Sequence, residues 1–193
     1  MENGTDWPTW IQAFTSVLAI LLAVFMPGIL KEVERRDKAL AIVGIFKLSI
    51  REVHNHVLAM GNVLQSRLGQ YQYPKEIKIE VFGKVIKKLE PMVNSQFELM
   101  RSVTAVDLPF PGMAVIPSTL ESSVEMLIDD VDLAIQRDKP VDEILAKYKW
   151  HRNNIHELIK ECDATLNKIQ DDLSPHPVVR MLKRAVVRLR DIN

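Results

Sequence analysis

A long uncharged run near the N-terminus constrains this chain more than any other feature of its sequence. No Asp, Glu, Lys or Arg occurs from Trp7 to Leu30. A helix of about 20 residues, rising about 1.5 Å per residue, crosses the roughly 30 Å hydrocarbon core of a bilayer. The run therefore predicts a transmembrane helix over residues 10–30, preceded by a short extracytoplasmic N-terminus, residues 1–9.

The residues that flank this run predict the orientation of the helix. Residues 1–9 contain Glu2 and Asp6 but no Lys or Arg, so they lack the basic region that begins a cleaved signal peptide. The basic residues come directly after the run: Lys31, Arg35, Arg36 and Lys38. Because basic flanks stay on the cytoplasmic side, we expect the N-terminus outside and residues 31–193 in the cytoplasm. The single cysteine, Cys162, forms no internal disulfide and suits a reducing compartment.

Polar and small residues recur inside the predicted span. They are Gln12, Thr15, Ser16, Ala19 and Ala23, spaced so that they share one helical face. In lipid, small residues allow helices to approach closely, and hydroxyl or amide groups bond between helices. The stripe predicts self-association of the span and, more specifically, a ring of helices lining a pore. The alternative is that these residues occur there by chance and the span is only an anchor.

The rest of the chain predicts helices throughout. Apolar residues recur at steps of three and four over residues 31–68, 76–106, 118–137 and 141–173, and no strand-type alternation is sustained. Pro27 and Pro91 predict kinks or breaks, and the prolines of residues 107–117 predict a loop. A capping box, Ser118 with Glu121, predicts the start of the third of these helices. We expect an all-α chain, with one transmembrane helix followed by a cytoplasmic bundle of four or five helices.

The last predicted helix, residues 177–193, is basic and amphipathic. It carries Arg180, Lys183, Arg184, Arg188 and Arg190 against Asp191 alone, a formal side-chain charge of 5 − 1 = +4. Two partners suit such a helix: the anionic membrane surface, or the acidic stretch Glu121–Asp132 of the bundle. We favour docking on the bundle, because the apolar face of the helix then has a core to join.

The sequence contains few signs of catalysis. It has no glycine-rich phosphate loop, no nucleophile elbow and no paired-cysteine metal motif, so we expect no cofactor and no metal. One pattern is typical of a reaction: Arg-x(4–6)-His is the ribonuclease signature of the HEPN superfamily of helical domains, where His serves as acid or base and Arg stabilises charge. Arg51 and His56 fit this spacing, whereas Arg152 and His156 are one residue too close. The alternative is a solvated Arg and a packing His in each pair.

The layout as a whole resembles that of a known group of proteins. A span that begins Trp7-Pro-Thr-Trp10-Ile-Gln-Ala13, a basic flank and a helical domain are similar to small bacterial single-span inner-membrane proteins found in phage-defence systems. The chain also resembles the HEPN-like membrane accessory proteins of type VI-B CRISPR systems, through this layout and the degenerate Arg152–His156 pair. That resemblance implies a divergent HEPN-like domain and assembly into a membrane pore.

Together these observations favour a non-enzymatic membrane protein that self-assembles and perturbs the inner membrane in antiviral defence. The expected partners are the lipid bilayer, further copies of the chain and an activating protein. The alternatives are a membrane-tethered HEPN-like ribonuclease, for which alone RNA is a partner, and a non-catalytic membrane adaptor.

Overall fold

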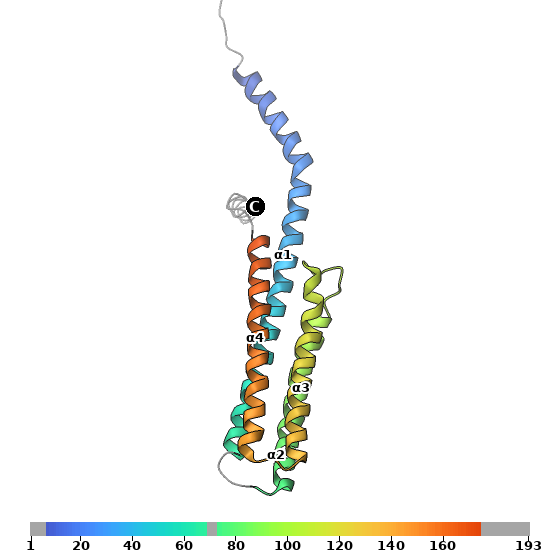
Figure 1. Cartoon of the computed structure of the whole chain (residues 1–193). Helices are drawn as coiled ribbons and strands as arrows, with labels where there is room; N and C mark the ends of the chain where they lie inside the picture. Colours follow the sequence, from blue (N-terminus) through green and yellow to red (C-terminus); the bar gives the residue numbers. More distant parts are fainter. Residues whose placement is uncertain (1–6, 69–72, 175–193) are drawn as a thin grey trace, which may run out of the picture. The chain divides into compact units, whose positions relative to one another are not determined.

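The computed structural model describes residues 7–68 and 73–174, with side chains from Phe14 onward. These residues form four α-helices and one 3-10 helix: α1 (Trp7–Leu68), α2 (Lys75–Arg101), η1 (Pro111–Val115), α3 (Ile116–Gln136) and α4 (Val141–Leu173) (Figure 1). No strand occurs within the two described ranges, so the predicted all-helical fold is confirmed. The predicted basic helix over residues 177–193 lies outside the described residues.

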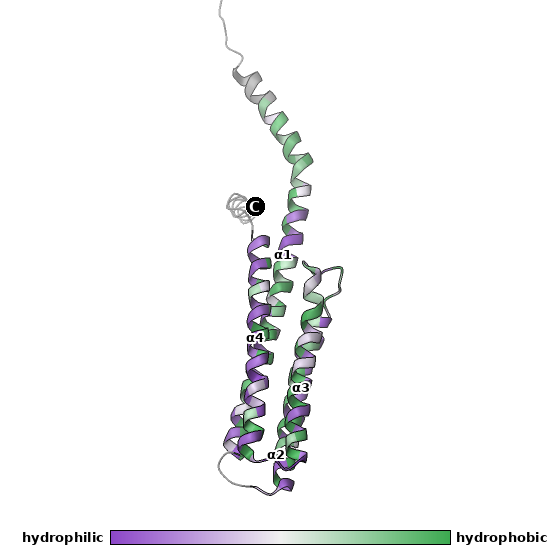
Figure 2. Cartoon of the chain, viewed as in Figure 1, coloured by the Kyte–Doolittle hydropathy of each residue, from purple (hydrophilic) through white to green (hydrophobic). Residues whose placement is uncertain are grey.

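The chain divides into two units, Met1–Lys38 and Ala39–Asn193. In the first unit, α1 carries an apolar stretch followed by charged residues from Lys31 to Lys38 (Figure 2). By length and composition it is the one helix, among those described, that could cross a membrane, and its apolar window is not buried. A kink or a break was predicted at Pro27, and α1 is continuous there, so no break occurs. A proline removes one intrahelical hydrogen bond, and the turns on either side retain theirs.

In the second unit, residues 39–68 of α1 pack with α2, α3 and α4 around one hydrophobic core. We call this unit the helical bundle. Consecutive helices run in opposite directions (Figure 1). The residues of α1 that recur at steps of three and four are buried: Ile42, Phe46, Ser49, Val53, Val57, Met60 and Leu64. The hydroxyl of Ser49 has no hydrogen-bond partner among the described residues.

The bounds of α2 correct two predictions. The helix continues through Pro91 and ends at Arg101, whereas we expected a kink or a division at Pro91 and an end at Val106. Pro91 is exposed, so the carbonyl that loses its helical partner can bond water instead. After Arg101 the chain enters a turn, in which the Thr104 hydroxyl donates to Asp107 at 2.5 Å.

The start of α3 corrects a third prediction. Residues 107–117 were expected to be a loop, but Pro111 begins the 3-10 helix and α3 follows at Ile116. A proline near a helix start suits the helix, because its N–H would lack an intrahelical partner there anyway. Met113, fully buried, attaches this segment to the core.

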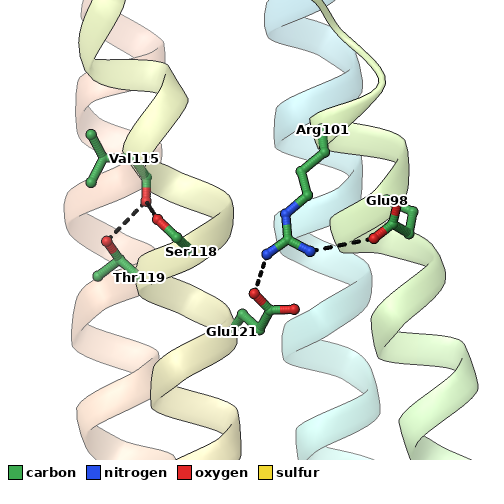
Figure 3. A network of polar contacts seen from close by, with 6 residues as sticks. All are labelled: Glu98, Arg101, Val115, Ser118, Thr119 and Glu121. Carbon is green, nitrogen blue, oxygen red and sulfur yellow. Dashed lines mark hydrogen bonds and ion pairs between the residues drawn. The ribbon is translucent and has the colours of Figure 1, made fainter.

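The predicted capping box is therefore wrong. The Ser118 hydroxyl donates to the Val115 carbonyl at 3.0 Å, inside the helix, and Glu121 pairs with Arg101 of α2 (Figure 3). Arg101 also bonds Glu98 at 3.3 Å. The ion pair thus joins the end of α2 to the first turns of α3.

A buried lysine joins α2 to the turn between α3 and α4. The Nζ atom of Lys78 donates to Asp138 Oδ1 at 2.9 Å and to the Lys139 carbonyl at 3.2 Å. Asp138 has a φ of 49°, the left-handed conformation that ends many helices. Lys139 N–H donates to the Ala134 carbonyl and Asp138 N–H to the Ile135 carbonyl, which is the Schellman pattern of such an end. Asp138 therefore both ends α3 and pairs with Lys78.

Gly61 of α1 lies against Tyr148 of α4. A Cβ atom at this position would lie 2.4 Å from Cε1 of Tyr148. The Tyr148 hydroxyl donates to the Val57 carbonyl, one turn earlier in α1. Gly61 thus leaves room for an aromatic ring that lies directly on the helix backbone.

Candidate functional site

The predicted oligomerisation residues lie in one continuous stretch of α1. Thr15, Ser16, Ala19 and Ala23 are all exposed in the described part of the first unit. Gln12 belongs to the same helix, but its side chain lies outside the described part. The helical backbone gives the five positions the common face that their spacing predicts.

The other faces of this stretch carry large apolar side chains. Phe14 and Phe25 are 71% and 61% exposed, and exposed leucine, isoleucine and valine side chains lie between them. This much apolar surface is stable only when lipid or another apolar surface covers it. The segment therefore has the physical character of a lipid-facing helix with one small, polar stripe.

Two partly buried histidines from different helices contact each other. Nδ1 of His156 in α4 lies 3.2 Å from Nε2 of His54 in α1, and the rings stack with centroids 4.9 Å apart. One ring nitrogen donates and the other accepts, which requires at least one neutral imidazole. Burial, His156 and the nearby charge of Arg152 lower the pKa of His54, and Asp163 opposes them. No role was predicted for His54 from the sequence.

The two predicted Arg/His pairs differ in their surroundings. Arg152 and His156 lie one turn apart on α4, and the charge of Arg152 acts on His54. Arg51 is exposed on α1. His56 lines a groove between α1 and α2, away from the helix face that carries His54. The structure therefore groups Arg152 and His156 with His54, rather than with Arg51 and His56.

This histidine pair could transfer protons beside a guanidinium, which is the chemistry that RNA cleavage needs. Its two facing nitrogens are occupied with each other, so one nitrogen of each ring remains for a substrate. No cluster of three or more His, Cys, Asp or Glu residues able to hold a metal occurs in the described residues.

The groove between α1 and α2, which we call the basic groove, has a volume of about 480 Å³. Its walls are mainly apolar, and its charged or titratable lining residues are His56, Arg67, Lys84 and Lys88. No Asp or Glu lines it. Lys84 pairs with Glu80 at 2.5 Å, whereas Arg67 and Lys88 have no ion-pair partner among the described residues. The groove thus presents positive charge around an apolar floor.

The groove between α3 and α4, which we call the acidic groove, has a volume of about 410 Å³. Asp129 and Asp130 line it, with no Lys or Arg in the lining. Nε2 of the buried His151 lies 2.8 Å from Asp130 Oδ2; this bond, followed by the charge of Lys147, lowers the pKa of Asp130. The Trp150 ring stands edge-on to His151, with centroids 4.7 Å apart.

Several of these residues had weak or no signals in the sequence. The steps of three and four over residues 141–173 predict Arg152 in the apolar stripe of α4, but His151 is buried there instead. Asp130, in the acidic stretch Glu121–Asp132, pairs with that histidine. Cys162 is buried as expected, and burial raises the pKa of its thiol. The signal that could have located the α1–α4 approach is Gly61, a glycine inside a helix whose cost needs a packing reason.

No family model matches this chain, and no curated protein or solved structure matches it either. The resemblance to defence-associated membrane proteins therefore stays a prediction.

Proposed function

We propose that this chain is a single-span protein of the cell inner membrane that self-assembles through its helices. The observation that carries the proposal is the exposed, uncharged stretch of α1 with its stripe of small and hydroxyl residues. Lipid covers the large apolar side chains in this proposal, and the stripe containing Ala19 and Ala23 meets the same stripe of another copy.

The proposed topology places the bundle in the cytoplasm. Four basic residues lie between Lys31 and Lys38, and none precedes the span. A reporter fused after Asn193 tests this orientation. We expect a fluorescent cytoplasmic reporter to be active and alkaline phosphatase to be inactive at that position; the reverse pattern contradicts the topology.

The consequence of assembly that we propose is perturbation of the inner membrane in a defence response, by a pore or a local defect. Polar side chains facing the centre of a helix ring would give water a path that a single span does not. The support is the polar stripe together with the layout resembling defence-associated membrane proteins. Dye release from liposomes that contain the full chain tests this step, and intact liposomes at high protein content contradict it.

The test of assembly uses paired variants of the full chain in mild detergent. Ala19→Ile with Ala23→Ile fills the space that close helix approach needs, so association should weaken by about tenfold, equivalent to about 1.4 kcal/mol. The control is Leu18→Ile with Leu22→Ile, which changes the shape but not the volume of two side chains outside the stripe. Light scattering gives the mass of each. An unchanged mass in the alanine variant contradicts assembly through the span.

A second candidate is a membrane-tethered ribonuclease, which the His54–His156 contact beside Arg152 favours. In this candidate, Arg152→Ala with His156→Ala abolishes RNA cleavage while the bundle stays folded. Arg51→Ala with His56→Ala separates the other predicted pair. If the full chain cleaves no RNA as an oligomer, the enzyme candidate fails and a pore or an adaptor remains.

A further inference from the structure

The basic and acidic grooves lie on opposite sides of the helical bundle. α3 packs against both α2 and α4, and α4 bonds α1 through Tyr148, so the helices follow one another around the core in chain order. In Figure 1, α3 and α4 lie in front of α1 and α2. The groove between α1 and α2 therefore faces away from the groove between α3 and α4.

The two grooves have opposite charge and similar size. Arg67, Lys84 and Lys88 line one, and Asp129 and Asp130 line the other. Their volumes are about 480 Å³ and 410 Å³. In each groove a nearby residue of opposite charge partly offsets the charge of the lining: Glu80 pairs with Lys84, and Lys147 lies near Asp130. Each lining still carries charge of a single sign.

Both grooves also expose apolar side chains that a partner would cover. Val63 and Met92 border the basic groove, 37% and 44% exposed. Met126 and Trp150 border the acidic groove, 57% and 61% exposed. Methionine and aromatic residues are enriched in protein–protein interfaces, and complementary charge selects and orients the partner.

We propose that the acidic groove of one copy docks on the basic groove of a second copy, so that the bundles join head to tail. This deepens the proposed self-assembly and rests on it, because it names the surfaces through which copies meet outside the membrane. A contact between two different surfaces of one chain leaves a free groove at each end. It therefore continues to a closed ring or an open chain rather than stopping at a dimer.

Cross-linking between differently labelled copies tests this arrangement. One full chain carries Met92→Cys and another Met126→Cys, and the two are mixed as detergent-solubilised oligomers and treated with a short bismaleimide. We expect cross-linked dimers in the mixture and few in either variant alone. The unaltered chain is the control for the buried Cys162. Dimers that form as readily in each variant alone as in the mixture indicate a symmetric contact and overturn the proposal.

Charge reversal supplies a second, independent readout. Lys88→Glu and Asp129→Lys should each weaken association by about tenfold, and mixing the two chains, or combining both changes in one chain, should restore it. Lys87→Glu and Glu161→Lys are matched controls, because both residues are exposed on the same or a neighbouring helix outside the groove linings. Reversal without effect, or without restoration, contradicts head-to-tail docking.

Two other outcomes are distinguishable. If the basic segment 177–193 of the same chain fills the acidic groove, Met126→Cys reacts with maleimide only after residues 177–193 are removed, and the proposal fails. If the unaltered chain is a monomer by light scattering at every concentration, self-assembly itself fails. An oligomer that forms normally but gives no Met92–Met126 cross-link overturns the docking alone.

Discussion

The close contact at Gly61 makes a quantitative prediction about how α1 and α4 pack. Replacing Gly61 by alanine adds one methyl group inside a helix, a change that usually stabilises a helix. Here the added Cβ would lie 2.4 Å from Cε1 and 2.5 Å from the hydroxyl of Tyr148. Tyr148 is buried and bonded to the Val57 carbonyl, so its ring has little room to move aside.

Three contributions set the expected size of the effect. Overpacking a core costs about 1–3 kcal/mol. Displacing the ring breaks the hydrogen bond to Val57, which contributes about 1 kcal/mol. The higher helix propensity of alanine offsets about 1 kcal/mol. Gly61→Ala should therefore lower the free energy of unfolding by about 1–3 kcal/mol.

The assay is unfolding of the full chain in mild detergent, followed by circular dichroism. Gly44→Ala is the matched control, because Gly44 lies in the same helix and has nothing within 4 Å of an added Cβ; it should stabilise by up to about 1 kcal/mol. Tyr148→Leu in the Gly61→Ala background should recover part of the loss. If Gly61→Ala stabilises as much as Gly44→Ala, the close approach of α4 to α1 is wrong.

Three further changes test the interior of the bundle. Ser49→Ala removes a buried hydroxyl without a described partner and should stabilise by about 1 kcal/mol in the same unfolding assay, whereas destabilisation would reveal a hidden partner. Asp138→Gly relieves the positive φ but leaves the buried Lys78 ammonium without its carboxylate partner, so alone it should destabilise the bundle by about 1–2 kcal/mol. In the Lys78→Met background the same change should stabilise, and equal effects in both backgrounds contradict the ion pair. Burial raises the pKa of Tyr148 from 10 to about 12. The neutral phenol therefore contributes fully to the free energy of unfolding below pH 10, and this contribution, about 3 kcal/mol, is lost as the pH rises towards 12. Tyr148→Phe should remove this pH dependence of stability.

The helices could be predicted from sequence because their apolar faces repeat at a helical period. α4 begins at Val141 and ends at Leu173, as expected, since Pro140 and Pro175 limit it on both sides. The errors lie at prolines. At Pro91 the lost hydrogen bond lies on the exposed side of a helix whose other face is buried, so packing outweighed it. At Pro111 and Pro117 the prolines open helical turns rather than prevent them.

The contacts between helices could not be predicted from the sequence. The stripe in α1 predicts which residues are buried but not which helix each one meets. His54 and His156 are 102 positions apart, and neither neighbourhood indicates the other. His54 and His56 are two positions apart in α1 and so lie on different faces of it, one against α4 and the other in the basic groove. Predicting the partner of each histidine would have required knowing which helices pack against each other.

The number of copies per assembly in a membrane tests the central claim most directly. A fluorescent protein fused after Asn193 allows bleaching steps to be counted for single particles in native membrane discs, over a tenfold range of expression. We predict several copies per particle at every level, with a shift towards one copy in the Ala19→Ile, Ala23→Ile variant. One copy per particle throughout the range would contradict self-assembly and leave α1 as an anchor alone.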